Sequence, residues 1–112
     1  VALRDRGQAA DAAAACHAFQ LQATSSLPGA DALPDIHTFP VPGAESGALC
    51  VVGYGSDADP HIEAVVSAVR GQTVYLLVQN LTLDFAAQHV DLSAQVARSF
   101  ALTGSSMELH DR

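Results

Sequence analysis

The sequence predicts an α+β domain in which an antiparallel sheet of about four strands is packed by two helices. Two segments, one near each end of the chain, have helical periodicity, and apolar runs rich in β-branched residues lie between them. With 112 residues, 49% of them hydrophobic and 15% charged, the chain has the size and composition of one globular domain. We assign residues 1–104 to this domain and residues 105–112 to a polar C-terminal tail.

The N-terminal part predicts a strand followed by a helix. Residues 1–4 have the composition of a strand, and helical spacing then continues from Gly7 to Thr24. The residues expected to form the packing stripe of this helix are Ala10, Ala13, Ala14, His17, Ala18 and Leu21. Because most of these side chains are small, the helix is expected to pack closely on its neighbour. The segment 25–29, SSLPG, ends it.

The middle of the chain predicts a hairpin at the edge of the sheet. Pro34, Pro40 and Pro42 disfavour a helix, so residues 36–39 are interpreted as a short edge strand, where proline is tolerated. Residues 48–54, ALCVVGY, have the β-branched and aromatic content of a strand. The turn-rich residues between these two segments are expected to join them.

Residues 59–70 are compatible with two structures that give different folds. As a helix capped by Asp59, with Pro60 in its first position, they would make the chain a ferredoxin-like βαββαβ domain with an added C-terminal helix. As a strand, they would turn at Gly71 and pair with residues 73–78 in a hairpin. The density of isoleucine and valine favours the hairpin.

A last helix is expected to cover the sheet. Asp84 is its expected cap, and Thr103-Gly104 its expected end. Its apolar stripe consists of Phe85, His89, Leu92, Val96 and Phe100.

Charge and hydropathy exclude some classes of partner. The formal net charge is −7, and the basic residues are five scattered arginines with no lysine, which disfavours nucleic-acid binding. No apolar run approaches the ~20 residues that span a bilayer, so no transmembrane segment is expected.

No catalytic, metal or cofactor motif is found. His17, His37, His61, His89 and His110 share no metal-binding spacing, and the oxygen and nitrogen donors of residues 57–63 lack the remaining ligands and the glycine of an EF-hand. No serine or cysteine lies in a nucleophile motif. One alternative remains: a small enzyme or a metal- or ligand-binding domain whose site brings His37, His61 or His89 together in space.

The two cysteines, Cys16 and Cys50, leave two interpretations open. In an exported domain they would pair in a disulfide, and in a cytosolic domain they would be two buried thiols. Their number and separation exclude a CxxC-type zinc or redox motif.

The order of several segments resembles the envelope lipoprotein domains of actinobacteria, and also extracellular sensor domains of mycobacterial serine/threonine kinases. The segments are Leu3-Arg4-Asp5, the alanine-rich residues 9–15, Leu27-Pro28-Gly29, and residues 69–75, VRGQTVY. The resemblance implies an extracytoplasmic location, with a cytoplasmic one as the alternative, and no catalytic residues. With export implied, we predict that Cys16 and Cys50 are bonded.

These observations together predict a non-catalytic binding or sensor module that recognises a protein partner or a small envelope ligand. A groove or an exposed sheet edge would make the contact, and residues 36–39 are the candidate edge. Phe39, Tyr54 and Tyr75 are the candidate binding residues, because aromatic side chains commonly anchor interfaces.

Overall fold

The computed structural model describes residues 2–5, 11–27, 29–33 and 35–102, and structural statements below concern these residues. The helices are α1 (Ala12–Ser26), α2 (Leu83–Gln88) and α3 (Val90–Arg98). The strands are β1 (Ala2–Asp5), β2 (Asp31–Ala32), β3 (His37–Thr38), β4 (Ser46–Ser56), β5 (Asp59–Arg70) and β6 (Thr73–Thr82). The predicted tail, residues 105–112, lies outside the described residues.

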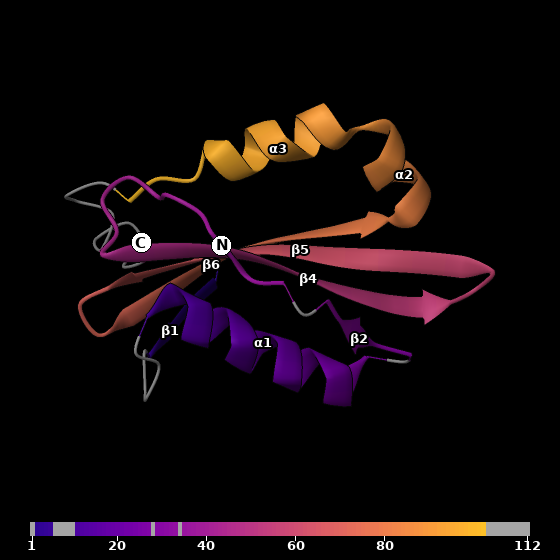
Figure 1. Ribbon diagram of the computed structural model, residues 1–112, viewed down its shortest axis with the longest axis horizontal. Coiled ribbons are helices and arrows are strands. Elements are labelled where there is room, and N and C mark those ends of the chain that lie inside the picture. The colour runs from indigo at the N-terminus through magenta and orange to yellow at the C-terminus, as the bar shows by residue number, and fades with distance from the viewer. Residues whose placement is uncertain (1, 6–10, 28, 34, 103–112) are drawn as a thin grey trace.

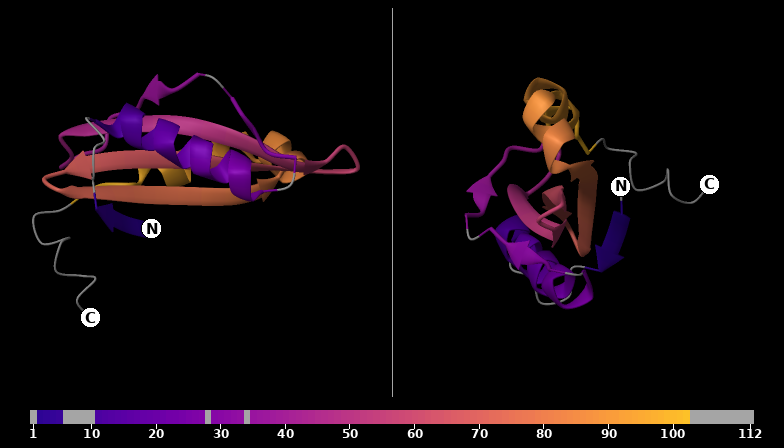
Figure 2. Two further views of the ribbon diagram at one scale, coloured as in Figure 1. Left: turned by 90° about the horizontal axis from the view of Figure 1, so that it is seen from below. Right: turned by 90° about the vertical axis from the view of Figure 1, so that its right-hand side faces the viewer.

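The strands form one antiparallel sheet in the order β1-β6-β5-β4-β2, and β3 also pairs with β4. Helix α1 covers one face of the sheet, and α2 and α3 lie over the opposite face (Figure 1). The β4–β5 hairpin projects beyond the other elements at one end (Figure 2). The predicted α+β class, with an antiparallel sheet packed by helices, is confirmed.

Residues 59–70 form a strand, so the hairpin prediction is confirmed and the ferredoxin-like alternative is wrong. Val69 pairs with Val74 and Arg70 with Thr73 across the turn. Gly71 has φ +61°, a left-handed conformation that other residues rarely adopt. All five residues from Val65 to Val69 are buried. Because helices or loops cover both faces of the sheet here, this part of the strand is buried on both sides.

Helix α1 packs through a different stripe from the predicted one. The Asp11 carboxylate caps it by accepting a hydrogen bond from the Ala14 N–H at 2.9 Å. Leu21, which the prediction placed in the stripe, is 60% exposed. The buried residues are Ala12, Ala15, Cys16, Gln20 and Ala23. Because alanine occurs on every side of this helix, hydrophobic periodicity does not define its inner face. The prediction of a close-packing face of small side chains is correct.

The predicted last helix is two helices, α2 and α3, with a break at His89. Thr82 caps α2 by accepting a hydrogen bond from the Phe85 N–H at 3.1 Å, so the prediction of Asp84 as the cap is wrong. Most of the predicted stripe faces solvent: Phe85, His89, Leu92 and Val96 are all exposed.

The inner side of α3 carries small and polar residues instead. The Ser93 hydroxyl donates to Gln79 Oε1 at 3.1 Å, and Gln79 Nε2 donates to the Ser93 carbonyl at 3.2 Å. Ala97 is buried on the same side of the helix. Phe100 is buried as predicted, although it lies beyond the end of α3. The inner side of α3 is thus the side that bonds Gln79 and buries Ala97, and the large side chains of the helix lie outside.

Two hydrophobic clusters form the core, one on each face of the sheet. The first lies under α1 and contains Ala12, Ala15, Cys16, Ala48, Cys50, Val65, Val69, Val74 and Leu76. The second lies on the face of α3 and contains Val41, Val66, Ala68, Tyr75, Ala97, Phe100 and Leu102. Alternate residues of each central strand contribute to opposite clusters, as the pleat of a strand requires.

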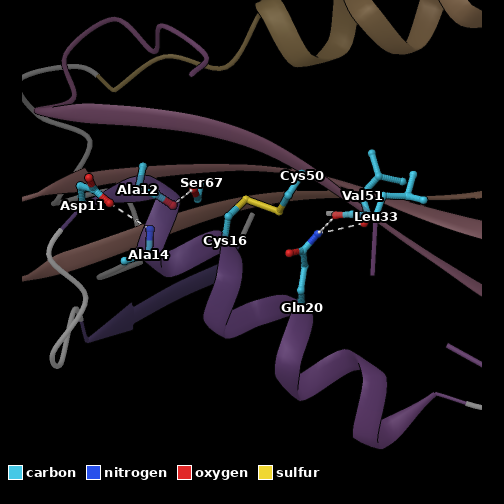
Figure 3. The surroundings of a disulfide bond; sticks show 9 residues. All are labelled: Asp11, Ala12, Ala14, Cys16, Gln20, Leu33, Cys50, Val51 and Ser67. Carbon is cyan, nitrogen blue, oxygen red and sulfur yellow. Dashed lines mark hydrogen bonds between the residues drawn. A yellow bond between two sulfur atoms is a disulfide. The ribbon is translucent and has the colours of Figure 1, made fainter. Parts of the chain in front are cut away.

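Polar and covalent links hold α1 on the sheet (Figure 3). Cys16 and Cys50 form a disulfide, with their Cα atoms 6.1 Å apart, which confirms the predicted bond. At the start of the helix, the buried Ser67 hydroxyl donates to the Ala12 carbonyl at 2.7 Å. Further along, the Gln20 side chain donates to the carbonyls of Leu33 and Val51 at 2.9 and 3.1 Å. Each half of α1 therefore has its own attachment.

Candidate binding groove

A largely apolar groove lies beside β3. Its volume is about 740 Å³. It is lined by Thr38, Phe39, Pro40, Val41, Pro42, Ala44, Glu45, Ser46, Gly47 and Arg98. All of these residues except Arg98 lie between Thr38, the last residue of β3, and Gly47, the second residue of β4, so one continuous segment builds most of the site.

Short hydrogen bonds and close packing fix the shape of this loop. The Phe39 N–H donates to the Gly47 carbonyl at 3.0 Å, and the Leu102 N–H donates to the Pro42 carbonyl at 2.7 Å. A Cβ atom on Gly47 would lie 2.1 Å from the Phe39 carbonyl oxygen, so only glycine allows this approach of the two segments. Pro40 and Pro42 restrict the backbone further because their φ angles are fixed. The groove is therefore held in one shape before any ligand arrives.

The groove has charged residues at two places. The Glu45 carboxylate accepts a hydrogen bond from the Gly71 N–H at 2.6 Å and is thereby tied to the β5–β6 turn. Arg98, in the last turn of α3, is exposed and makes no hydrogen bond or ion pair with the other described residues. A guanidinium group at this place can form charge-assisted hydrogen bonds with an anionic ligand group.

The edge of the sheet next to the groove is short. Since Phe39 and Gly47 are hydrogen-bonded, the neighbouring pair Thr38–Ala48 is a non-hydrogen-bonded one, and the Thr38 backbone groups point away from β4. Pro40, which follows, has no N–H group. An incoming strand could therefore pair with β3 at one residue, and the groove offers the larger contact.

The three candidate binding residues do not come together in the structure. Phe39 lines the groove and packs against the core cluster on the face of α3. Tyr54 lies on the opposite face, because it has the same strand parity as Cys50, which is bonded to α1. Tyr75 is only 3% exposed and belongs to the core, so its predicted role as a surface anchor does not fit its position. A single partner surface cannot include all three residues.

The three histidines of the alternative hypothesis are also separated. His37 pairs with Leu49 and His61 with Tyr54, which places them on opposite faces of the sheet. His89 lies between α2 and α3. His61 Nε2 is 3.0 Å from an Asp59 carboxylate oxygen. No set of three His, Cys, Asp or Glu side chains that could hold a metal ion occurs in the described part of the chain.

Sequence reasoning identified Phe39 but missed Arg98. Arg98 is distant in sequence from the loop that it joins, and nothing in its local pattern indicates that it lies there. The signal for a shaped loop is the clustering of Pro40, Pro42 and Gly43, from which the sequence predicts only an edge strand and the turn that follows it.

None of the helices that the structure describes is long and apolar enough to cross a membrane. Comparisons with protein-family models, with curated proteins and with solved structures find no match to this chain. Its function is therefore inferred from its own geometry.

Proposed function

We propose that this domain is a non-catalytic binding or sensor module of the bacterial cell envelope. It recognises a protein partner or a small envelope ligand through the groove lined by Phe39. The observation that carries the proposal is the groove itself, an apolar hollow of about 740 Å³ whose walls are fixed by two prolines and by the contact between Phe39 and Gly47. Ligand sites in proteins are typically preformed, apolar and of this size.

An extracytoplasmic location is supported by the cysteines. Cys16 and Cys50 are bonded, and the structure contains no free cysteine among its described residues. Disulfides persist in oxidising compartments and are rare in the cytosol, where thiols are kept reduced. The envelope location thus agrees with the resemblance in the sequence.

The chemistry of the groove indicates what it would accept. Phe39, Val41 and the prolines favour an apolar body, and Arg98 favours an anionic group at one end. A partner segment with a large apolar residue next to a carboxylate, or a short acyl chain with a carboxylate, has both features.

Titration of the isotope-labelled domain with octanoate, followed by NMR, tests the proposal. We expect resonances of Phe39, Val41 and Arg98 to shift together and saturably. Phe39→Ala should weaken the binding of octanoate at least about tenfold, since truncation of a central anchor costs ≥ ~1.4 kcal/mol. Arg98→Ala should weaken the binding of octanoate but leave the binding of 1-octanol, which has no charge, unaffected.

Phe85→Ala is the matched control, because Phe85 is an exposed aromatic residue outside the groove. The same three variants are then compared in pull-downs from envelope extract, with circular dichroism to confirm that each is folded. If Phe39→Ala captures partners and binds octanoate as well as the unaltered domain does, the groove is not the binding site.

A further inference from the structure

A group of hydrogen-bonded polar side chains lies on the α1 face of the sheet, away from the groove. Three adjacent strands place Val52, Glu63 and Asn80 side by side, and Tyr54 lies in the next row. The Tyr54 hydroxyl donates to Asn80 Oδ1 at 2.5 Å, and Asn80 Nδ2 donates to Glu63 Oε2 at 3.0 Å. This chain of hydrogen bonds fixes the Glu63 carboxylate and engages one of its two oxygens.

Glu63 also lines a small cavity between the sheet and the C-terminal half of α1. Its volume is about 180 Å³, and the other lining residues are Phe19, Gln22, Ala23, Ser26 and Leu27. One water-sized group needs about 10–15 Å³ of such a volume, so the cavity has room for several connected groups of that size. It therefore holds the end of one side chain or a small molecule. Phe19, Ala23 and Leu27 make one wall apolar, and Glu63 supplies a carboxylate opposite.

The end of α1 adds negative potential at the same cavity. The C-terminus of a helix carries a partial negative charge from its last carbonyl groups, and cations stabilise it. The last turn of α1 contains no basic residue. Ser26 and Leu27, which line the cavity, are the last residue of the helix and its cap. The helix end and the Glu63 carboxylate thus both favour a positive charge at this position.

We propose that this cavity binds an organic monocation on an alkyl stem, that is, a primary ammonium or guanidinium group whose carbon chain lies against Phe19 and Leu27. A protein partner's lysine or arginine and a free alkylamine share this chemistry. A metal ion fits less well, because the described residues provide one carboxylate here and no group of three ligands.

Neither of the two arginines whose side chains the structure describes, Arg70 and Arg98, fills the site. The sequence has no lysine. Arg70 lies at the end of β5 by the β5–β6 turn, and Arg98 lines the groove on the opposite face. The proposed cation site is therefore independent of the groove and of the function proposed for it.

An NMR titration with n-pentylammonium tests the proposal, with 1-pentanol as the neutral probe of the same length. We expect pentylammonium to shift resonances of Phe19, Leu27 and Glu63 saturably, and pentanol to bind at least about fivefold more weakly. Raising the salt concentration should weaken the binding of pentylammonium but not that of pentanol, because salt screens charge interactions. Nα-acetyl-lysine methylamide, titrated in parallel, distinguishes the sources. If this lysine derivative binds more tightly than pentylammonium, the natural ligand is a side chain of a protein partner. If it binds more weakly, the natural ligand is a free amine.

Glu63→Gln keeps the hydrogen bond from Asn80 and removes the charge, so it should lower pentylammonium affinity at least about fivefold. Asp91→Asn removes the same charge from α3, on the opposite face, and should leave the affinity unchanged. Tyr54→Phe should lower the affinity for pentylammonium about twofold, because it removes the hydrogen bond that holds the Asn80 side chain in place. The proposal is overturned if pentanol shifts the same resonances as strongly as pentylammonium in the unaltered domain, or if Glu63→Gln binds pentylammonium with undiminished affinity.

Discussion

Cys16, in the N-terminal half of α1, is bonded to Cys50 in β4, and both residues are at most 1% exposed. The bond spans a sequence separation of 34 residues and joins the helix to a central strand of the sheet. Because neither sulfur is accessible, the link lies within the core that it stabilises. The bond stabilises the folded state mainly by reducing the conformational freedom of the unfolded chain.

Removal of this bond should destabilise the domain strongly. For a loop of this length, loss of the cross-link is expected to lower the free energy of unfolding by about 3–4 kcal/mol. Urea unfolding of the oxidised protein, of the reduced protein and of the Cys16→Ala/Cys50→Ala variant measures the effect. Mass spectrometry of the unreduced protein should show the loss of two hydrogens. Equal urea midpoints for the oxidised and reduced forms would contradict the prediction.

Gln20→Leu should loosen the edge of the sheet. Gln20 is 3% exposed, and its replacement leaves the Leu33 and Val51 carbonyls without its two hydrogen bonds. A hydrogen bond contributes about 0.5–1.5 kcal/mol to stability, so the loss of two should lower the free energy of unfolding by about 1–3 kcal/mol. Hydrogen exchange should also accelerate at the Leu33 N–H, which pairs with Val51. Gln95→Leu, at an exposed position on α3, is the control and should change neither quantity.

Phe100 and Phe85 should differ sharply when each is replaced by alanine. Phe100 is 9% exposed and belongs to a core cluster, so Phe100→Ala should cost about 3–5 kcal/mol. Phe85 is 42% exposed and contacts the His89 ring, so Phe85→Ala should cost below about 1 kcal/mol. Thermal or urea unfolding gives both values. Similar losses for the two variants would mean that α2 packs more tightly than the structure shows.

Tyr75→Phe should leave stability unchanged or raise it. The Tyr75 hydroxyl is buried and has no hydrogen-bond partner among the described residues. Such a group costs free energy when it is taken from water, so its removal is expected to stabilise the domain by up to about 1–2 kcal/mol. Ser67→Ala is the contrasting variant. It removes a buried hydroxyl that donates to the Ala12 carbonyl, and it should destabilise the protein. A destabilised Tyr75→Phe would show that the hydroxyl has a partner in solution.

The strand assignments were accessible from sequence because they depend on local properties. Dense isoleucine and valine favour an extended strand over a helix, and Gly71 allows the turn that joins β5 and β6. The edge position of β3 followed from Pro34, Pro40 and Pro42, since proline cannot donate to a ladder. These preferences require no knowledge of the neighbouring elements.

The orientation of the helices was not accessible in the same way. Helix α3 turns Ser93 toward Gln79 of β6, and these two residues meet only when β6 and α3 lie side by side. Without that contact, the large apolar residues of the segment indicate the wrong inner face. The groove was missed for a related reason, since Arg98 reaches the loop of residues 38–47 only through the packing of the chain that follows α3.

By itself, the sequence determined the α+β class, the central hairpin, the short edge strand and, together with the implied export, the bond between Cys16 and Cys50. Tertiary structure alone decided which side chains each helix buries, that Tyr54 and Phe39 lie on opposite faces, and that Tyr75 is buried. The reason is that strand and turn preferences act between neighbours in the chain. The inner face of a helix and the composition of a site depend on contacts between residues far apart in sequence, which exist only after the layers have packed.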